Sequence, residues 1–117
     1  MKTAIDWFEH FIHILENIEV TNKGGQVIPR QDGFGELLKQ TCHRQEAGQR
    51  FFFIGNGASA SMASHIAADL CKNGHLRTEV FTDLALITAL VNDLGVEQMF
   101  AKPLRELAVA RSEEHTS

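Results

Sequence analysis

His65 and Asp69 are the residues of this chain whose types and spacing point most directly to chemistry. Four positions separate them, within a stretch of helical periodicity from about residue 59 to residue 72. This spacing puts an imidazole and a carboxylate on one face of a helix, within reach of one divalent metal ion such as Zn²⁺ or of one proton relay. A pair of this kind is also a common surface hydrogen bond, so the spacing alone leaves both interpretations open.

A second candidate lies just before that helix, in a segment rich in glycine and serine. The apolar run Phe51–Ile54 predicts a buried strand, and residues 55–61 then read Gly-Asn-Gly-Ala-Ser-Ala-Ser. Gly55 and Gly57 permit backbone conformations and a close ligand approach that a Cβ atom would prevent. Ser59 can cap the helix or bind a ligand oxygen. Because a helix N-terminus offers free N–H groups and a positive dipole end, the loop predicts a phosphorylated small molecule as ligand.

Two nucleotide-binding motifs compete for the same loop. A P-loop requires a lysine directly after its second glycine, but no lysine follows Gly57 until Lys72. The dinucleotide pattern is satisfied by Gly55, Gly57 and Ala60, although Asp83 lies further along than the usual gap of about 20 residues to the ribose-binding acid. We therefore expect no nucleotide cofactor and keep a nucleotide-binding fragment as the third hypothesis.

The elements around these residues alternate between helices and strands. Thr3 and Asp6 form the pattern of a capping box that opens a helix ending near Val20 to Lys23. Together with Trp7 and Ile14, the apolar stripe of this helix makes a surface wider than one core contact needs, which predicts packing against another subunit. The stripe consists of Ile5, Phe8, Phe11, Ile12, Leu15 and Ile18.

The remaining segments predict the βαβ order of a parallel sheet. We expect the third helix to bury Met62, Ile66, Ala67 and Leu70. The predicted segments are a helix from after Asp32 to near Ala47-Gly48, a strand at 51–54, a helix at 59–72, a strand at 77–81, a helix at 84–91, a turn at 92–95 and a short helix around Met99 to Pro103.

The composition limits the class of protein. The chain has 117 residues and a formal net charge of -4, without a lysine- or arginine-rich run, so we expect neither nucleic acid nor an anionic membrane as partner. It contains no apolar run of the roughly 20 residues needed to span a bilayer. We expect a cytoplasmic protein in which Cys42 and Cys71 are reduced, mostly buried thiols.

Three segments together resemble the sugar isomerase (SIS) domain, with the phosphoheptose isomerases as the most similar group. They are the loop and helix from Gly55 to Leu70, the sequence Leu-Val-Asn-Asp-Leu-Gly at 90–95, and Phe-Ala-Lys-Pro-Leu at 100–104. The resemblance implies an α/β fold, a three-layer α/β/α parallel sheet of flavodoxin- or Rossmann-like type, preceded by a long N-terminal helix. Residues 1–110 would be the N-terminal part of this domain, with helices in 1–48 and the βαβα part in 49–110. The family also implies a homo-oligomer, typically a tetramer.

The same resemblance assigns roles to individual residues. Asn56 and Ser59, within the loop that contains Gly55 and Gly57, match positions that contact the phosphosugar, as do Asn92 and Asp93 further along. His65 matches a metal-ligand histidine. Asp69 stands where the family has a glutamate that approaches the metal and serves as base, and it is one methylene shorter, which makes catalysis less secure than binding.

The implied activity is the interconversion of sedoheptulose 7-phosphate and a heptose 7-phosphate by proton transfer through an enediol. A non-catalytic phosphosugar sensor or partner-binding regulator is the alternative. We expect the chain by itself to be inactive, because the resemblance places a second phosphate loop beyond it. Residues 111–117 resemble the translation of a common sequencing-library adapter, and our hypothesis is that they are a non-native tail.

Overall fold

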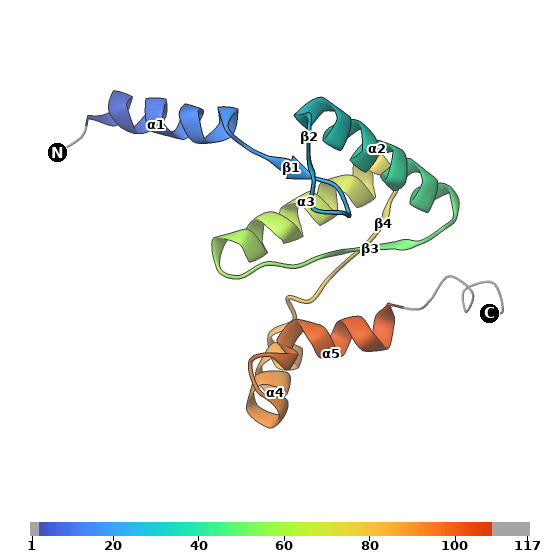
Figure 1. The fold of residues 1–117 in the computed structure, drawn as a ribbon. Coiled ribbons are helices and arrows are strands. Elements are labelled where there is room, and N and C mark those ends of the chain that lie inside the picture. The colour runs from blue at the N-terminus through green and yellow to red at the C-terminus, as the bar shows by residue number, and fades with distance from the viewer. Residues whose placement is uncertain (1–2, 109–117) are drawn as a thin grey trace. The chain divides into compact units, whose positions relative to one another are not determined.

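The computed structural model describes residues 3–108, which divide into two compact units with the boundary between His43 and Arg44. The proposed non-native tail at 111–117 lies outside the described residues. Figure 1 shows the order of helices and strands along the chain. The elements are α1 (Ala4–Glu16), β1 (Val20–Thr21), β2 (Val27–Ile28), α2 (Arg30–Glu46), β3 (Arg50–Phe53), α3 (Ala58–Gly74), β4 (Arg77–Val80), α4 (Leu84–Leu94) and α5 (Gln98–Leu107).

In the first unit, α1 begins at the predicted capping box. The Thr3 hydroxyl accepts a hydrogen bond from the Asp6 amide, and the Asp6 carboxylate accepts one from the Thr3 amide. The helix ends at Glu16, earlier than the predicted end near Val20 to Lys23. The reason is a short antiparallel pair, in which Val20 lies opposite Ile28 and the Asn22 side chain accepts hydrogen bonds within the intervening turn.

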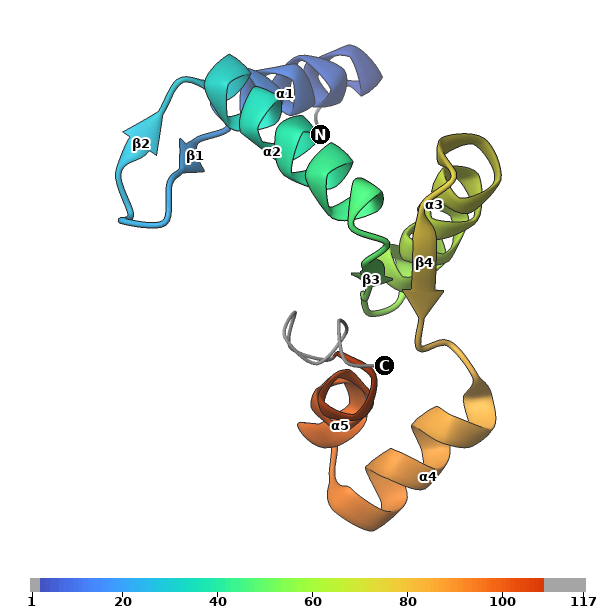
Figure 2. The same cartoon turned by 90° about the vertical axis from the view of Figure 1, so that its right-hand side faces the viewer.

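The second unit contains the predicted parallel strand pair. β3 and β4 run parallel in register from Arg50 opposite Arg77 to Phe53 opposite Val80, and α3 packs on both strands. The Thr78 hydroxyl donates a hydrogen bond to the Ala67 carbonyl at 2.9 Å, which ties α3 to β4. Figure 2 shows β4 leading toward α4, which contacts α5. The described residues thus form a mixed α/β structure with a two-stranded parallel sheet, and the three layers of the SIS fold remain an expectation.

Few residues of the second unit are fully buried, and they come from α3, from both ends of β4 and from α5, where Pro103 is buried. The other buried residues are Ala67, Leu76 and Phe81, and the Phe81 ring stacks on Phe52 at 5.8 Å between centroids. The predicted buried face of α3 is wrong for Met62 and Ile66, which are 62% and 42% exposed. The residue of this helix that is buried is Ala67.

Three other expectations are corrected. Cys42 and Cys71 are free thiols but lie exposed on the surfaces of their helices, so a helical pattern alone did not show which side is buried. Phe51 to Phe53 are half-buried where full burial was expected, since α3 covers one face of a pair of strands only. The predicted turn at 92–95 is helical up to Leu94, and α4 ends at Gly95, whose φ of 100° is unfavourable for other residues.

Among residues 3–108, no single helix has both the length and the apolar composition needed to cross a membrane. The pair α4 and α5 meets that test only when taken together, and the two helices are bent by 111° relative to each other.

Candidate functional site

The loop between β3 and α3 is shaped by two glycines that act for different reasons. A Cβ atom on Gly55 would lie 2.5 Å from the carbonyl carbon and 2.6 Å from the carbonyl oxygen of Ser59, which are backbone atoms that cannot easily move. Gly57 has open space around it, but its φ of 60° and ψ of -125° form a conformation that only glycine adopts readily. The sharp entry into α3 therefore requires glycine at both positions.

Ser59 closes this loop with its own side chain. Its hydroxyl accepts a hydrogen bond from the Asn56 amide at 2.9 Å and donates one to the Asn56 carbonyl at 2.7 Å. Because the hydroxyl proton is already used, donation to a phosphate would require a ligand oxygen to replace the Asn56 carbonyl. In this arrangement Ser59 maintains the shape of the loop, and phosphate contact by Ser59 remains a prediction.

The start of α3 leaves backbone donors available. Gly57 is the N-cap, and no side chain caps the helix. Within the described residues, the N–H groups of Gly57 and Ala58 have no hydrogen-bond acceptor. Free N–H groups at the positive end of a helix dipole form a suitable site for an anion.

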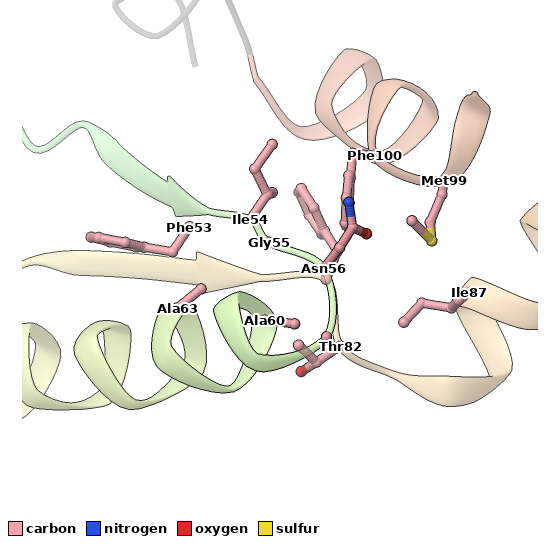
Figure 3. Close-up of a pocket in the computed structure, with 12 residues that line it drawn as sticks. Phe53, Ile54, Gly55, Asn56, Ala60, Ala63, Thr82, Ile87, Met99 and Phe100 are labelled. Atoms are coloured by element: carbon pink, nitrogen blue, oxygen red, sulfur yellow. The ribbon is translucent and has the colours of Figure 1, made fainter. Parts of the chain in front are cut away.

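A pocket of about 200 Å³ lies beside this loop. Figure 3 shows that it is bounded by the loop, by the start of α3 and by side chains from α4 and α5. Its polar edge includes Gly55, Asn56, Gly57 and Thr82. Its apolar wall consists of Phe53, Ile54, Phe81, Ile87, Met99 and Phe100. Such a pocket, mostly apolar with a few polar groups near an anion site, suits a small phosphorylated molecule.

His65 and Asp69 form the expected pair but lie outside this pocket. The His65 Nε2 atom is 3.2 Å from the Asp69 Oδ2 atom, and the side chains are 78% and 48% exposed. His65 instead lines a shallow depression together with Ala60, Ser61, Ser64 and Thr82. The pair is therefore separate from the loop pocket. The depression that contains His65 nevertheless shares Ala60 and Thr82 with the loop pocket.

The fit of this pair to a metal ion is incomplete within the described residues. No group of three or more His, Cys, Asp or Glu side chains among residues 3–108 is arranged to hold a metal ion. A catalytic zinc ion takes three protein ligands. His65 and Asp69 would supply two of them, so a metal at this position remains a proposal that requires further ligands.

Asn92 and Asp93 lie in the last turn of α4. The Asn92 side-chain amide donates a hydrogen bond to the Asp93 carboxylate at 3.1 Å. Neither residue lines the loop pocket. Contact of Asn92 and Asp93 with the sugar therefore stays a prediction.

Sequence reasoning did not assign several of the residues that line the pocket to a ligand site. Thr82, Ile87, Met99 and Phe100 come from segments after β4 and approach the loop only in the folded chain. For Thr82 a signal existed, because it is a polar residue directly after a predicted strand. The carboxyl ends of parallel strands form the edge where ligands bind in open α/β sheets.

Asp83 bears on the nucleotide hypothesis. Its carboxylate caps α4 by accepting a hydrogen bond from the Leu86 amide at 3.0 Å. The acid that would contact a ribose is thus already engaged as a helix cap.

Comparison with known proteins gives one consistent group. No protein-family model matches the chain, and neither does any solved structure. The phosphoheptose isomerase of Helicobacter pylori (strain ATCC 700392 / 26695) is 35% identical over 67% of this chain and 46% of its own length. That of Geotalea uraniireducens (strain Rf4) is 30% identical over 72% and 46%, and that of Paramagnetospirillum magneticum (strain ATCC 700264 / AMB-1) is 28% identical over 80% and 51%.

The chain spans about half the length of the curated relatives it matches. The similarity supports a relationship to the phosphoheptose isomerases over the matched half, in agreement with the resemblance of the loop and helix motifs.

Proposed function

We propose that this chain is the phosphosugar-binding N-terminal part of a sugar-phosphate isomerase of the phosphoheptose isomerase type. The observation that carries the proposal is the glycine loop, with its free N–H groups at the start of α3, in a chain similar to proteins named phosphoheptose isomerase. The substrate class is a ketose phosphate such as sedoheptulose 7-phosphate. The loop would bind the phosphate, while the polar side chains further along α3 would face the reacting end of the sugar.

The proposed reaction moves a proton between C1 and C2 of the open-chain sugar. A base removes a proton from C1 of the ketose while the C2 carbonyl oxygen takes up a proton, which gives the enediol. The base then returns its proton to C2 while the O1 hydroxyl loses its proton, which gives the aldose. Asp69 is the candidate base, and His65, 3.2 Å from it, would orient its carboxylate. A divalent metal such as zinc would polarise the sugar carbonyl if further ligands complete its site.

The test compares the full-length protein with its Asp69→Asn variant in the conversion of sedoheptulose 7-phosphate. The amide cannot accept the proton, so we expect turnover to fall by at least about 100-fold. Asp32→Asn is the control because Asp32, in the first turn of α2, lines neither the loop pocket nor the depression that contains His65 and should leave turnover unchanged. Unchanged turnover in Asp69→Asn would remove Asp69 from the mechanism.

The alternative is a non-catalytic phosphosugar sensor or partner-binding regulator. A phosphosugar-dependent rise in thermal stability without any turnover would favour this alternative. A nucleotide-binding fragment would instead respond to NAD, and the engagement of Asp83 as a helix cap argues against it.

We further propose that the protein is a cytoplasmic homo-oligomer, as the apolar stripe of α1 and the family resemblance suggest.

A further inference from the structure

We propose that the side-chain hydroxyl of Thr82 binds a hydroxyl group of the sugar chain, between the phosphate at the glycine loop and the reacting end near His65. This inference rests on the proposed phosphosugar function and assigns a substrate-binding residue that the sequence motifs did not indicate.

The position of Thr82 in the sheet is the first argument. Thr82 follows β4, just as Gly55 follows β3, and the two strands are parallel neighbours. Their carboxyl ends therefore meet at one edge of the sheet, where the loop pocket lies. Figure 3 shows Thr82 beside Ala60 at the start of α3.

Thr82 also connects the two hollows of this region, the loop pocket and the depression that contains His65. Thr82 and Ala60 are the residues that line both the loop pocket and the depression containing His65. Of the two, only Thr82 carries a side chain that can form hydrogen bonds. A ligand that extends from the loop toward His65 would pass this hydroxyl.

The backbone holds Thr82 firmly from both sides. Phe81, which precedes it, is 4% exposed and stacks on Phe52. Asp83, which follows it, caps α4 through its side chain and accepts a further hydrogen bond at its carbonyl from the Ile87 amide at 3.0 Å. Because the backbone on both sides of Thr82 is held in this way, only the side-chain rotamer of Thr82 must be ordered when it binds a ligand group.

The hydroxyl of Thr82 is available to a ligand. Thr41, Thr78 and Thr88 each donate their hydroxyl proton to a backbone carbonyl. Among the described residues, no hydrogen-bond partner is found for the hydroxyl of Thr82, whose side chain is exposed. Both its donor and its acceptor capacity therefore remain for a sugar hydroxyl.

The experiment measures binding of two probes, sedoheptulose 7-phosphate and inorganic phosphate, to the full-length protein by calorimetric titration. Thr82→Val removes the hydroxyl at nearly constant shape, and Thr82→Ser keeps it. Thr88→Val is the matched control, since the Thr88 hydroxyl bonds to the Leu84 carbonyl within α4 and lines neither hollow. Thr82→Ala serves as a second deletion of the hydroxyl should the valine variant fold poorly.

We expect Thr82→Val and Thr82→Ala to weaken sedoheptulose 7-phosphate binding about 3- to 10-fold, the usual effect of one lost neutral hydrogen bond. Inorganic phosphate, which would contact the loop alone, should bind equally well to all variants. Thr82→Ser and Thr88→Val should behave as the unsubstituted protein.

Equal binding of the sugar phosphate to Thr82→Val and to the unsubstituted protein would overturn the inference while leaving the proposed function intact. An equal loss for both probes would also overturn it, because the substitution would then act on the loop as a whole. Failure of the unsubstituted protein to bind sedoheptulose 7-phosphate would reject the proposed function itself.

Discussion

Gly55 shows how a single residue can determine whether the loop forms. Gly55→Ala would place a Cβ atom 2.5 Å from the Ser59 carbonyl carbon, and the Ser59 backbone belongs to the first turn of α3. We expect the free energy of unfolding of the full-length protein to fall by about 1–3 kcal/mol, the usual cost of forcing an atom into a well-packed position. Chemical denaturation followed by circular dichroism measures it.

The matched control is Gly35→Ala in α2. Apart from its chain neighbours and the nearby backbone of α2, no atom of the described residues lies within 4 Å of the Cβ position of Gly35, and alanine is the better helix former. Stability should therefore stay equal or rise. If Gly55→Ala were as stable as Gly35→Ala, the close approach of the loop to α3 would be refuted.

At the same scale, the sequence predicted the glycines of the loop but not the bonding of Ser59. Residue type shows that a serine hydroxyl can bind a helix amide or a ligand. Only the path of the backbone shows that it bonds to the Asn56 amide and carbonyl instead.

At the scale of the element, α1 depends on a carboxylate at its start. Hydrogen bonds from the Thr3 amide and hydroxyl group lower the pKa of the Asp6 carboxyl group below its ordinary value of 3.8. A lowered pKa in the folded chain means that the capping box stabilises the helix above the ordinary pKa and loses this effect as the pH falls through the lowered pKa.

We therefore expect the helical Cα chemical shifts of the first turn of α1 to decrease as the pH is lowered from about pH 6 to about pH 2. NMR spectra of Asp6→Ala should show a weakened first turn throughout this range, without the additional change caused by Asp6. Glu9→Ala, one turn further along, is the control. Identical pH profiles for Asp6→Ala and the unsubstituted protein would contradict this role of Asp6.

The same capping signal was visible in the sequence because a capping box is local, involving residues three apart. The ends of other elements were less predictable. α1 stops before Val20 because Val20 pairs with Ile28, a contact that periodicity does not show. α4 extends through Asn92 and Asp93 because the apolar period continues to Leu94.

At the scale of the whole molecule, α1 presents an apolar surface that the described residues leave open. Ile5, Trp7 and Phe8 are 70%, 60% and 59% exposed, and Trp7 stacks on Phe11 at 5.9 Å. An exposed apolar surface of this kind is typical of a contact between proteins.

We expect a second copy of the protein to cover this surface. Light scattering during size-exclusion chromatography of the full-length protein should give the mass of an oligomer, and Phe11→Asp should lower that mass because it introduces a charge into the contact. Glu9→Ala on the same helix should leave the mass unchanged. A monomeric mass for the unsubstituted protein would reject the expectation.

By itself, the sequence determined the local features of this protein. These features depend on neighbouring residues and on short periodicities, both of which can be read directly from the sequence. They are the capping box, the glycine loop, the i, i+4 pair and the βαβ order. The resemblance to the phosphoheptose isomerases was also visible in the sequence, and the similar proteins support it. The tertiary structure decided which side chains meet: it placed Thr82 between the loop pocket and His65, engaged Asp83 in capping α4, and left Met62 and Ile66 exposed. These outcomes depend on how parallel strands align and on which helix face meets them, and no local pattern specifies either.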